Sequence, residues 1–344
     1  MSQKFAPTVS VVMGVYNGAR FLREAIHSVL DQTFGDFEFI IIDDGSTDET
    51  AEILHGFSDP RVRILTHEKN EGLTRSLIRG CSEARGKYVA RMDADDISHL
   101  DRFSMQVEFL EENPEYTVAG TQFHFIDAFG RKRQVSSMPR LEEEVREAIE
   151  RAHSPVAHGS AMFVRERILG CGGYREMFRY AQDFDLWLRV LERYRITNLP
   201  EILYGLRFHG LSATRRHYYL QCRFVEMARR FAKMRAENGL DPLMRGDIES
   251  VRAEIESWKP EGFIQASRMR SETALRLAEV WVDWVRLSDI FRLWVLAAIN
   301  DPANKDVWKF LASRRFRSRL ARTARGRLKR RSRNANHESF TGRS

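Results

Sequence analysis

The fold is decided by the stretch VSVVMGVY at residues 9–16, an almost unbroken apolar run rich in β-branched residues. Runs of this kind are typical of a strand that is buried on both faces in a parallel sheet. Asn17-Gly18 ends the run, and the apolar residues of 21–32 then recur at the three- and four-residue spacing of a helix. A second apolar strand follows at 37–42. The stretch therefore predicts a βαβ unit.

The same alternation continues to residue 92. We expect a helix at 50–57, a strand at 62–65, a helix at 73–84 and a strand at 87–92. Strands that alternate with helices in this way predict an α/β fold, with a mostly parallel sheet flanked by helices. Such sheets bind their ligands at the carboxyl ends of the strands. The functional site is therefore expected just after these strands.

Directly after the strand at 87–92, the motif RMDADD places the three carboxylates of Asp93, Asp95 and Asp96 within four positions. Carboxylates this close repel one another, unless a cation or a proton joins them. Oxygen ligands of this kind suit Mg²⁺ or Mn²⁺. The alternative is an acidic turn in water that caps the next helix, where Asp is common.

Further polar residues follow the first two strands. Val15 and Asn17 lie at the end of the first strand, and Asp43 and Asp44 lie at the end of the second. All of them should reach the sheet edge that carries the acidic cluster. Ordinary turn chemistry in the segment DDGST is the alternative for the two aspartates. Convergence at one edge favours ligand binding.

The second half of the chain has a mixed pattern of helices and strands. We expect helices at 101–110, 142–151 and 183–194, and strands at 116–127 and 158–164. From about residue 215 the sequence is rich in helix formers and lacks β-rich runs. This organisation predicts a first domain at 1–212, a helical C-terminal appendage at 213–312 and a flexible basic tail at 313–344.

The composition is that of a globular protein. The chain has 344 residues, of which 43% are hydrophobic and 11% aromatic. Its three cysteines are odd in number and widely spaced, which indicates a reducing compartment and neither disulfides nor a zinc site. The first residues lack the pattern of a secretory signal, and no apolar run approaches the ~20 residues that cross a bilayer. We therefore expect a cytoplasmic protein.

The basic residues are concentrated near the end of the chain. Eleven Lys or Arg and no acid occur between Arg314 and Arg333, whereas the rest of the chain is net acidic. Such a tail could lie on an anionic membrane leaflet, bind nucleic acid or remain in water. The net negative charge of the rest of the chain argues against nucleic acid as a partner.

The ordered set of motifs resembles family 2 glycosyltransferases with the GT-A fold, a Rossmann-like α/β fold. The resemblance covers about residues 7–212, and implies a nucleotide-binding half at 1–96 and an acceptor half at 97–212. It rests on the opening strand at 9–17, SVLDQTF at 28–34, IDDGSTD at 42–48, NEGL at 70–73, GKY at 86–88, MDADD at 92–96 and QDFDLWLR at 182–189.

The resemblance implies an inverting transferase that uses a nucleoside-diphosphate sugar, expected to be UDP-linked. Asp95 corresponds to the acid that holds Mn²⁺ or Mg²⁺, with Asp93 on the metal or the ribose and His209 as a weaker ligand. Asp44 corresponds to the acid that reads the nucleobase. The nucleotide is expected to contact Val15, Asn17, Asp43, Asp44, Asp93 and Ala94.

The catalytic base of the family corresponds to Asp183. The preceding residue is Gln182, where the family usually has an acid, so one nearby negative charge is absent. His158, Arg207 and Gln182 could contact the acceptor or a phosphate, although structural histidines are common. Asp185 is expected to face elsewhere on the helix, and Arg189 to pair with a carboxylate. By family analogy, the acceptor would be a glycan or lipid-linked glycan at the inner face of the cell membrane.

Three other functions remain open on sequence grounds. The acidic cluster could belong to a Mg²⁺-dependent phosphatase, although such enzymes carry the motif on their first strand. A nucleotidyltransferase would need a glycine-rich basic loop after the first strand, and the segment GVYNG at 14–18 is short and neutral. A non-catalytic nucleotide-sugar binding protein would not need Asp183.

Overall fold

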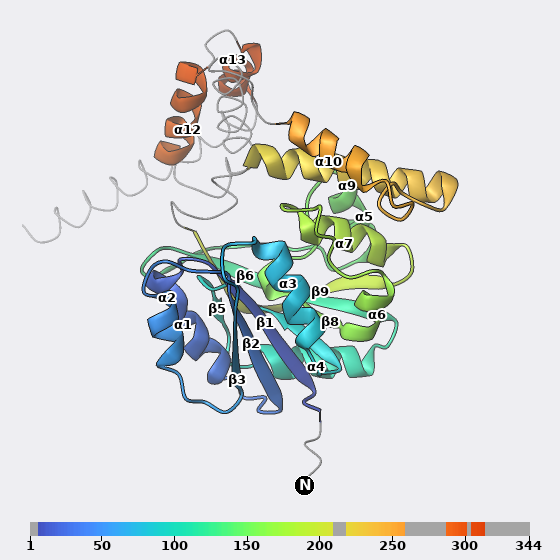
Figure 1. Ribbon diagram of the computed structural model, residues 1–344. Helices are drawn as coiled ribbons and strands as arrows, with labels where there is room; N and C mark the ends of the chain where they lie inside the picture. The colour runs from blue at the N-terminus through green and yellow to red at the C-terminus, as the bar shows by residue number, and fades with distance from the viewer. Residues whose placement is uncertain (1–5, 209–217, 259–286, 301–303, 314–344) are drawn as a thin grey trace, which may run out of the picture. The chain divides into compact units, whose positions relative to one another are not determined.

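The computed structural model describes residues 6–208, 218–258, 287–300 and 304–313 (Figure 1). The chain divides into two compact units. The first consists of residues 1–212 and 221–252, and the second of residues 213–220 and 253–344. His209 and the basic tail after residue 313 lie outside the described residues.

In the described part of the chain, nine strands form one sheet in the order β3-β2-β1-β4-β8-β6-β9-β5, with β7 beside β6. The strands are β1 (Val9–Val15), β2 (Phe37–Asp43), β3 (Val62–Thr66), β4 (Tyr88–Arg91), β5 (Ile97–Ser98), β6 (Tyr116–Ile126), β7 (Lys132–Val135), β8 (Met162–Val164) and β9 (Arg195–Arg207).

The two halves of the sheet differ in strand direction. β3, β2, β1 and β4 are all parallel to one another, as the sequence predicts. β8, however, pairs antiparallel with both β4 and β6, and β5 pairs antiparallel with β9. Only β6 and β9 are parallel in the second half. The expectation of a mostly parallel sheet therefore applies to β1, β2, β3 and β4 and is corrected to a mixed sheet for the rest.

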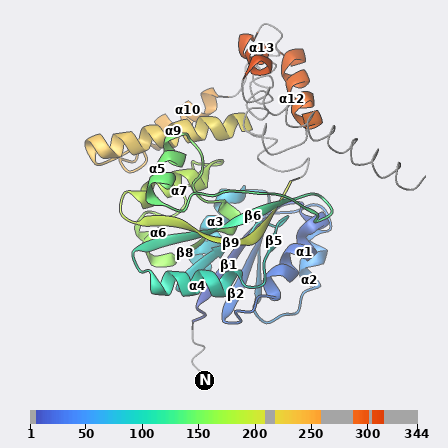
Figure 2. The ribbon, with the colours of Figure 1, turned by 180° about the vertical axis from the view of Figure 1, so that it is seen from behind.

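Helices cover both faces of the sheet (Figures 1 and 2). One face packs against α1 (Ala19–Leu30), α2 (Thr50–His55) and α4 (Arg102–Glu112). The other packs against α3 (Leu73–Glu83), α6 (Arg165–Gly170) and α7 (Gln182–Leu191). Each face has its own apolar core. The sheet is thus the middle layer of three, and its strand ends form an open edge.

The alternation of side chains along β1 explains these two cores. Val11 and Met13 pack with the core of α1, whereas Val12 packs with the core of α3. α3 lies very close to the sheet at Gly80, where a Cβ would come within 2.8 Å of Ile42 Cδ1. A larger residue at position 80 would push α3 away from the sheet.

The three cysteines are free thiols, as the sequence predicts. Cys81 on α3 and Cys171 after α6 are buried. Burial raises the pKa of the Cys81 thiol to about 12, so it remains protonated at neutral pH. Cys222 is part-exposed and lies on α9 (Tyr218–Asn238).

Most of α9 belongs to the first unit, which includes residues 221–252 in addition to residues 1–212, and the boundary expected at residue 212 stays a prediction. Its buried face carries Phe224, Met227, Ala228 and Phe231 at helical spacing. The rings of Phe224 and Phe231 lie 5.8 and 6.1 Å from the ring of Phe178 in the loop before α7. α9 therefore packs against the loop that leads into the predicted catalytic helix.

The second unit contains α12 (Leu287–Asn300) and α13 (Lys305–Ala312) among its described residues. Trp294 Nε1 on α12 donates a hydrogen bond to the carbonyl oxygen of Val307 at 2.8 Å. Large apolar side chains on these helices remain exposed, among them Phe291, Ile299 and Trp308. Within the described ranges, no helix combines the length and the apolar character that a membrane span requires.

Candidate active site

The parallel strands bring the predicted nucleotide-binding residues to one edge of the sheet. Val15 pairs with Asp43 in the β1–β2 register, and its carbonyl oxygen accepts a hydrogen bond from the backbone N–H of Asp44 at 2.8 Å. Ala94 also lies next to the β1–α1 loop, because a Cβ on Gly18 would sit 3.8 Å from its Cβ. The ends of β1, β2 and β4 therefore meet.

Asn17 and Asp43 hold the loops at this edge. Asn17 has φ 51°, in the left-handed region that Asn adopts more readily than most residues. Its Oδ1 accepts a hydrogen bond from the backbone N–H of Thr47 at 2.8 Å. Oδ1 of Asp43 accepts one from the backbone N–H of Ser46 at 3.0 Å. In this structure both side chains therefore shape the β2–α2 loop.

Asp44 is buried and carries three protein hydrogen bonds. Its Oδ1 lies 2.7 Å from Nδ1 of His67 and accepts the backbone N–H of Glu71 at 3.0 Å. Its Oδ2 accepts the backbone N–H of Gly72 at 2.8 Å. These bonds draw the β3–α3 loop over the end of β2. Asp44 thus fixes this loop, and its contact with a nucleobase stays a prediction.

Tyr16 is a further residue at this edge, and the sequence reasoning did not single it out. It stands between Val15 and Asn17, and 48% of its surface is exposed. A large aromatic side chain in water directly after a buried strand is the signal that could have found it. Its ring offers a flat apolar face beside the strand ends.

The acidic cluster is only partly compensated by neighbouring cations. Arg91 Nη2 lies 2.5 Å from Asp93 Oδ1, and the Arg91 side chain is almost fully buried. Burial nevertheless raises the pKa of Asp93, and the charge of Asp95 raises it further, against the effect of Arg91. The pKa of Asp96 lies well above its usual value, mainly through burial and then through Asp95 and Asp93. A cation at this position would relieve this repulsion.

The residues present suit a metal ion that is held mainly by its substrate. Among the described residues, no three His, Cys, Asp or Glu side chains are arranged to hold a metal by themselves. Mg²⁺ and Mn²⁺ are commonly bound by one or two carboxylates, with substrate phosphates and water as the remaining ligands. Asp93 and Asp95 could supply such a partial set. The structure does not describe His209, the third predicted ligand.

Arg207 holds the acidic cluster in place from the end of β9. Its Nε donates to the carbonyl oxygen of Asp95 at 2.6 Å, and its Nη2 lies 2.6 Å from Glu24 Oε2. Its Nη1 donates to the carbonyl oxygen of Asp127 at 3.1 Å, and its backbone N–H donates to Asp96 Oδ1 at 2.6 Å. The guanidinium is therefore engaged by protein atoms, whereas the sequence suggested contact with an acceptor or phosphate.

Asp183 lies in the first turn of α7. The helix begins after Ala181, a non-glycine residue at φ 52°, and backbone strain of this kind is commonly found at functional sites. Ser154 Oγ donates to Asp183 Oδ2 at 3.4 Å. Burial raises the pKa of Asp183, and the charge of Asp93 raises it further. The predicted base and the acidic cluster therefore lie within electrostatic reach of each other.

His158 contacts the loop that leads into α7 through Tyr174. His158 begins the short 3-10 helix η1 (His158–Ser160), and its Nε2 lies 2.7 Å from the Tyr174 hydroxyl. Burial lowers the pKa of His158 well below its usual value, and Arg91 lowers it further. His158 is therefore neutral at physiological pH, which argues against a role as a cationic phosphate ligand.

Tyr204 on β9 lies beside η1 and Asp93. Its hydroxyl accepts the backbone N–H of Asp93 at 3.3 Å. A Cβ at Gly159 would sit 2.7 Å from Asp93 Oδ2 and overlap the Tyr204 hydroxyl. η1 is thus packed directly against both side chains. No motif in the sequence links residues 159 and 204 to Asp93, and the sequence reasoning missed Tyr174 and Tyr204.

Two expectations about α7 are confirmed. Asp185 faces away from Asp183 into the protein, and its Oδ2 lies 2.8 Å from Arg189 Nη2. Arg189 also donates to the carbonyl oxygen of Gly173 at 2.7 Å. Both side chains are almost fully buried. Gln182 is buried at the start of the helix.

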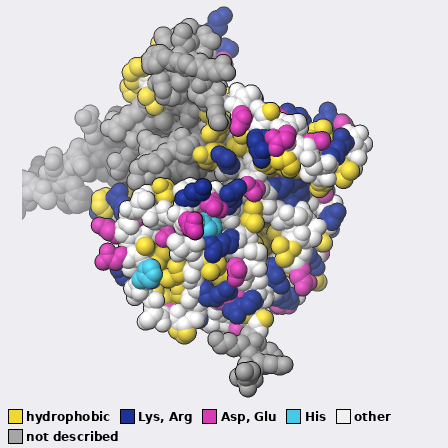
Figure 3. Space-filling view, in the orientation of Figure 1, with side chains coloured by type: hydrophobic (Ala, Val, Ile, Leu, Met, Phe, Trp, Pro, Cys, Tyr) yellow, Lys and Arg dark blue, Asp and Glu magenta, His cyan; other side chains and the backbone are white. Residues whose placement is uncertain are grey.

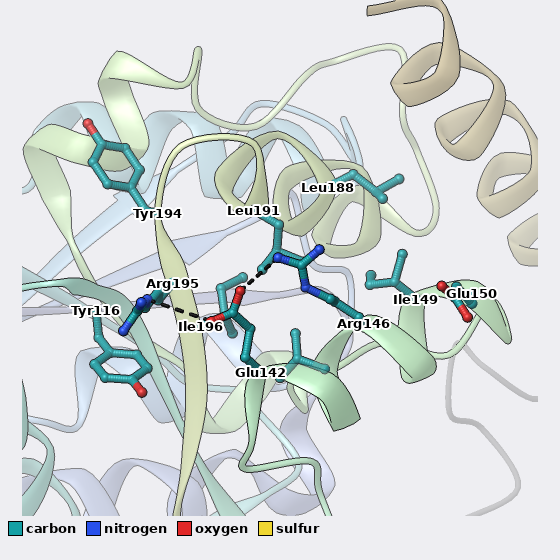
Figure 4. Close-up of a pocket in the computed structure, with 11 residues that line it drawn as sticks. Tyr116, Glu142, Arg146, Ile149, Glu150, Leu188, Leu191, Tyr194, Arg195 and Ile196 are labelled. Carbon is teal, nitrogen blue, oxygen red and sulfur yellow. Dashed lines mark hydrogen bonds and ion pairs between the residues drawn. The ribbon is translucent and has the colours of Figure 1, made fainter. Parts of the chain in front are cut away.

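A separate cavity of about 260 Å³ lies between α5 (Glu142–Glu150), α7 and β9 (Figure 4). At its wall, Glu142 stands between Arg146 and Arg195, with N–O distances of 2.7 and 3.8 Å. None of the predicted site residues lines this cavity. The strand-end edge therefore remains the candidate active site.

Comparisons with known proteins identify the family. The model of glycosyl transferase family 2 matches residues 10–173. The glycosyltransferase EpsE of Bacillus subtilis is 37% identical over 218 residues, which cover 62% of this chain and 77% of EpsE. The chain belongs to glycosyltransferase family 2. Of the functions left open by the sequence, this transferase therefore has the glycosyltransferase function, and the phosphatase, nucleotidyltransferase and non-catalytic alternatives are not supported.

Other relatives agree with this assignment. The amylovoran biosynthesis glycosyltransferase AmsE of Erwinia amylovora is 28% identical over 58% of this chain and 75% of its own length. Staphylococcus aureus TarS, solved in complex with UDP, superposes with a TM-score of 0.53 at 17% identity and covers 93% of this chain and 92% of the solved one.

A second solved structure has the same fold. The mannosyltransferase PcManGT of Pyrobaculum calidifontis was solved with GDP-Man and Mn²⁺. It superposes with a TM-score of 0.52 at 17% identity, covering 94% of this chain and 88% of the solved one. The transferase therefore has the GT-A fold that the resemblance implied.

Proposed function

We propose that this transferase moves a hexosyl group from a nucleoside-diphosphate sugar, UDP-linked, to a hydroxyl of a glycan or lipid-linked acceptor, with inversion at the anomeric carbon. The observation that carries the proposal is the position of Asp183 within electrostatic reach of Asp93, with a pKa raised by burial and by that charge. A single displacement requires a carboxylate base close to the group that holds the diphosphate, and we assign these two parts to Asp183 and the acidic cluster.

The donor would lie across the ends of β1, β2 and β4. Its nucleoside would contact Val15, Asn17, Asp43, Asp44, Asp93 and Ala94, and Tyr16 offers a ring on which the base can stack. The names of two fold relatives, with UDP in one and GDP-Man in the other, support this class of donor. The name of AmsE supports a role in polysaccharide biosynthesis.

A divalent cation, Mn²⁺ or Mg²⁺, would be held by Asp95 and Asp93 together with the diphosphate. When bound, it supplies positive charge that stabilises the diphosphate as a leaving group. Arg207 and Arg91 keep the two ligand positions in place through their bonds to the Asp95 carbonyl and the Asp93 carboxylate. Mn²⁺ in the PcManGT structure supports the choice of metal.

Asp183 would take the proton of the acceptor hydroxyl. As that oxygen forms its bond to the anomeric carbon, the bond between this carbon and the diphosphate oxygen breaks, and the electron pair leaves with the nucleotide. The raised pKa of Asp183 improves its strength as a base at neutral pH. Neutral His158 and buried Gln182 would line the acceptor side without adding charge.

The base assignment is tested with Asp183→Asn. We expect turnover with the active nucleotide sugar to fall about 10²-fold or more. The affinity for UDP with Mn²⁺, measured by calorimetry, should remain near that of the wild type. If Asp183→Asn retains its turnover, or the product keeps the anomeric configuration of the donor, the proposed mechanism is wrong.

The metal assignment is tested with Asp95→Ala in the same calorimetric assay. Binding of UDP should lose its dependence on Mn²⁺, because Asp95 is the main proposed protein ligand. A panel of UDP-, GDP- and dTDP-sugars, scored by nucleotide release with Mn²⁺ or Mg²⁺, identifies the donor. Metal-dependent UDP binding that is undiminished in Asp95→Ala would remove this residue from the site.

The basic tail would hold the enzyme on the inner face of the cell membrane. Each basic residue near an anionic leaflet contributes about 1 kcal/mol. Exposed Phe291, Ile299 and Trp308 on α12 and α13 add apolar side chains to the region that precedes the tail in sequence. Truncation after Ala312 should reduce sedimentation with anionic vesicles and leave nucleotide release unchanged. Equal sedimentation of both forms at low and high salt would contradict the proposal.

A further inference from the structure

A buried group of charged residues connects α7 to the segment beyond the family match. Asp185 Oδ2 lies 3.4 Å from Arg175 Nε, and Arg175 Nη1 lies 2.8 Å from Asp241 Oδ2. The same oxygen of Asp241 lies 2.6 Å from Arg235 Nη1 on α9. Arg235 Nη2 in turn lies 2.7 Å from Glu192 Oε1 at the end of α7. The chain of contacts thus begins in the first turn of α7 and returns to its last.

The group is balanced in charge and has Asp241 as its centre. Its members are three acids and three arginines: Asp185, Glu192, Asp241, Arg175, Arg189 and Arg235. Asp241 is fully buried, and its second oxygen accepts the backbone N–H of Met244 at 3.0 Å. Burial would raise the pKa of Asp241, but Arg175 and Arg235 lower it overall. Asp241 therefore favours its charged form.

The group holds the loop from Cys171 to Ala181, which carries Tyr174 and leads directly into Asp183. Arg189 donates hydrogen bonds to carbonyl oxygens in this loop, as described for Gly173. Phe178 in the same loop packs against two rings of α9, and its carbonyl oxygen accepts the Thr74 hydroxyl at 2.7 Å. The loop is thus fixed on one side by α3 and on the other by α9 and Asp241.

Buried ion pairs of this kind contribute little net stability compared with apolar residues of the same shape. Three atoms of the group, Asp185 Oδ1, Arg175 Nη2 and Arg235 Nη2, even lack a hydrogen-bond partner within the described structure, although Arg235 Nη2 lies within ion-pair distance of Glu192. These ion pairs hold the first turn of α7 in one defined geometry, which non-directional apolar packing would not do. Ala181 in its left-handed conformation also has to be held by its surroundings.

We propose that Asp241 is a positioning residue for catalysis: through Arg175 and Arg235 it fixes the loop and the helix start that place Asp183 and Tyr174. The segment 221–252 is then a functional part of the enzyme, although the family model ends at residue 173. This inference rests on the proposed role of Asp183 as the base.

The chain offers a matched control at Glu38. This carboxylate is also almost fully buried and also lies between two arginines, at 3.0 Å from Arg63 Nη1 and 2.6 Å from Arg85 Nη2. It lies near the start of β2, at the end of the strand opposite to Asp43. Glu38→Gln therefore removes the same kind of interaction without touching the loop before α7.

The experiment compares Asp241→Asn with Glu38→Gln and the wild type in the full chain. For Asp241→Asn we expect kcat for nucleotide release to fall about 10-fold or more, because small displacements of a catalytic group have large effects. The affinity for UDP with Mn²⁺ should change less than about twofold. Glu38→Gln should show a similar fall in melting temperature and a kcat near that of the wild type. Equal kcat in both variants would overturn the proposal.

Hydrogen exchange gives a second readout that does not depend on activity. Amides of residues 174–185 should exchange faster in Asp241→Asn than in Glu38→Gln at equal temperature. If Asp241→Asn does not fold, the same measurements are made on Arg235→Lys. Lys keeps the positive charge but cannot bind Glu192 and Asp241 at the same time as the guanidinium of Arg235 does. A wild type that releases no nucleotide from any sugar nucleotide would refute the proposed function, while the exchange rates would still decide the role of Asp241. Unchanged exchange in that segment would overturn the role.

Discussion

Gly159→Ala is expected to disable the site through one added methyl group. The Cβ of the new side chain would sit 2.7 Å from Asp93 Oδ2 and 2.8 Å from Tyr204 Cζ. An ordinary contact needs at least 3.4 Å, so Asp93 Oδ2 has to move by roughly 0.7 Å, and Tyr204 by more because its hydroxyl overlaps the new Cβ. Asp93 cannot yield easily, because Arg91 holds its carboxylate. Tyr204 and η1 must therefore yield, and both are packed directly against Asp93 of the proposed diphosphate site.

A displacement close to 1 Å at a catalytic group costs on the order of 10²-fold in rate. Overpacking of this size costs about 1–3 kcal/mol of stability, which most folded domains survive. We expect Gly159→Ala to fold, to lose about 10²-fold in kcat/KM for nucleotide release, and to need more Mn²⁺ for half-maximal activity. Steady-state kinetics over a Mn²⁺ titration, together with thermal unfolding, measure all three quantities.

Gly170→Ala is the matched control, because a Cβ at Gly170 meets no atom within 4 Å. It should leave the rate and the Mn²⁺ dependence unchanged. Gly159→Ala/Tyr204→Phe should recover part of the loss, since the hydroxyl that overlaps the new methyl is then absent. Wild-type kinetics in Gly159→Ala would refute the view that η1 and Asp93 are packed as one rigid wall of the site.

Three further results are expected. The raised pKa of Asp183 means that its active carboxylate form is lost at a higher pH than for an ordinary Asp, so the acid limb of the pH–rate profile should lie above the usual Asp range. Because the pKa of Asp183 is raised in the folded protein, the folded state favours the protonated carboxyl group, and the free energy of unfolding falls as pH rises through this pKa. Asp183→Asn should therefore raise the melting temperature at pH 8 while it lowers activity. Arg207→Lys should lower stability by about 1.5–3 kcal/mol, because Lys cannot keep the charged hydrogen bonds to the Asp95 carbonyl and Glu24 together; an unchanged midpoint in urea would contradict this.

The four parallel strands β1 to β4 could be predicted because their sequence signals are local. β1 and β2 are continuous apolar runs, and their polar ends must meet at one edge once the strands are parallel. β8 could not be oriented in this way, since it has only three residues and pairs with strands far away in sequence. Its antiparallel direction is a result of tertiary packing.

The roles of individual side chains were harder to predict than their positions. Asp44 and Arg207 lie at the expected edge, but their bonds to Gly72 and to the Asp95 carbonyl come from segments 28 and 112 residues away. Tyr204 reaches Asp93 across a separation of 111 residues. Sequence periodicity carries no information about such pairs, whereas burial and hydrogen bonding in the fold do.

The distribution of charge also limits what the sequence alone could indicate. On the face of the first unit that α3 covers, Lys and Arg side chains alternate with Asp and Glu (Figure 3). Many of them form pairs, such as Arg75 with Glu176. The net charge of +7 therefore says little about this face, because the excess of basic residues lies in the sequence after residue 313.

The state of the three thiols makes the transferase convenient for labelling. Cys81 and Cys171 are buried, and Cys81 remains a protonated thiol near neutral pH, so neither should react readily with a maleimide dye. Cys222 is part-exposed and lies two residues before Phe224, whose ring contacts Phe178. A fluorophore attached there, in the unaltered chain, would report on the loop that leads to Asp183 as donor and acceptor are added.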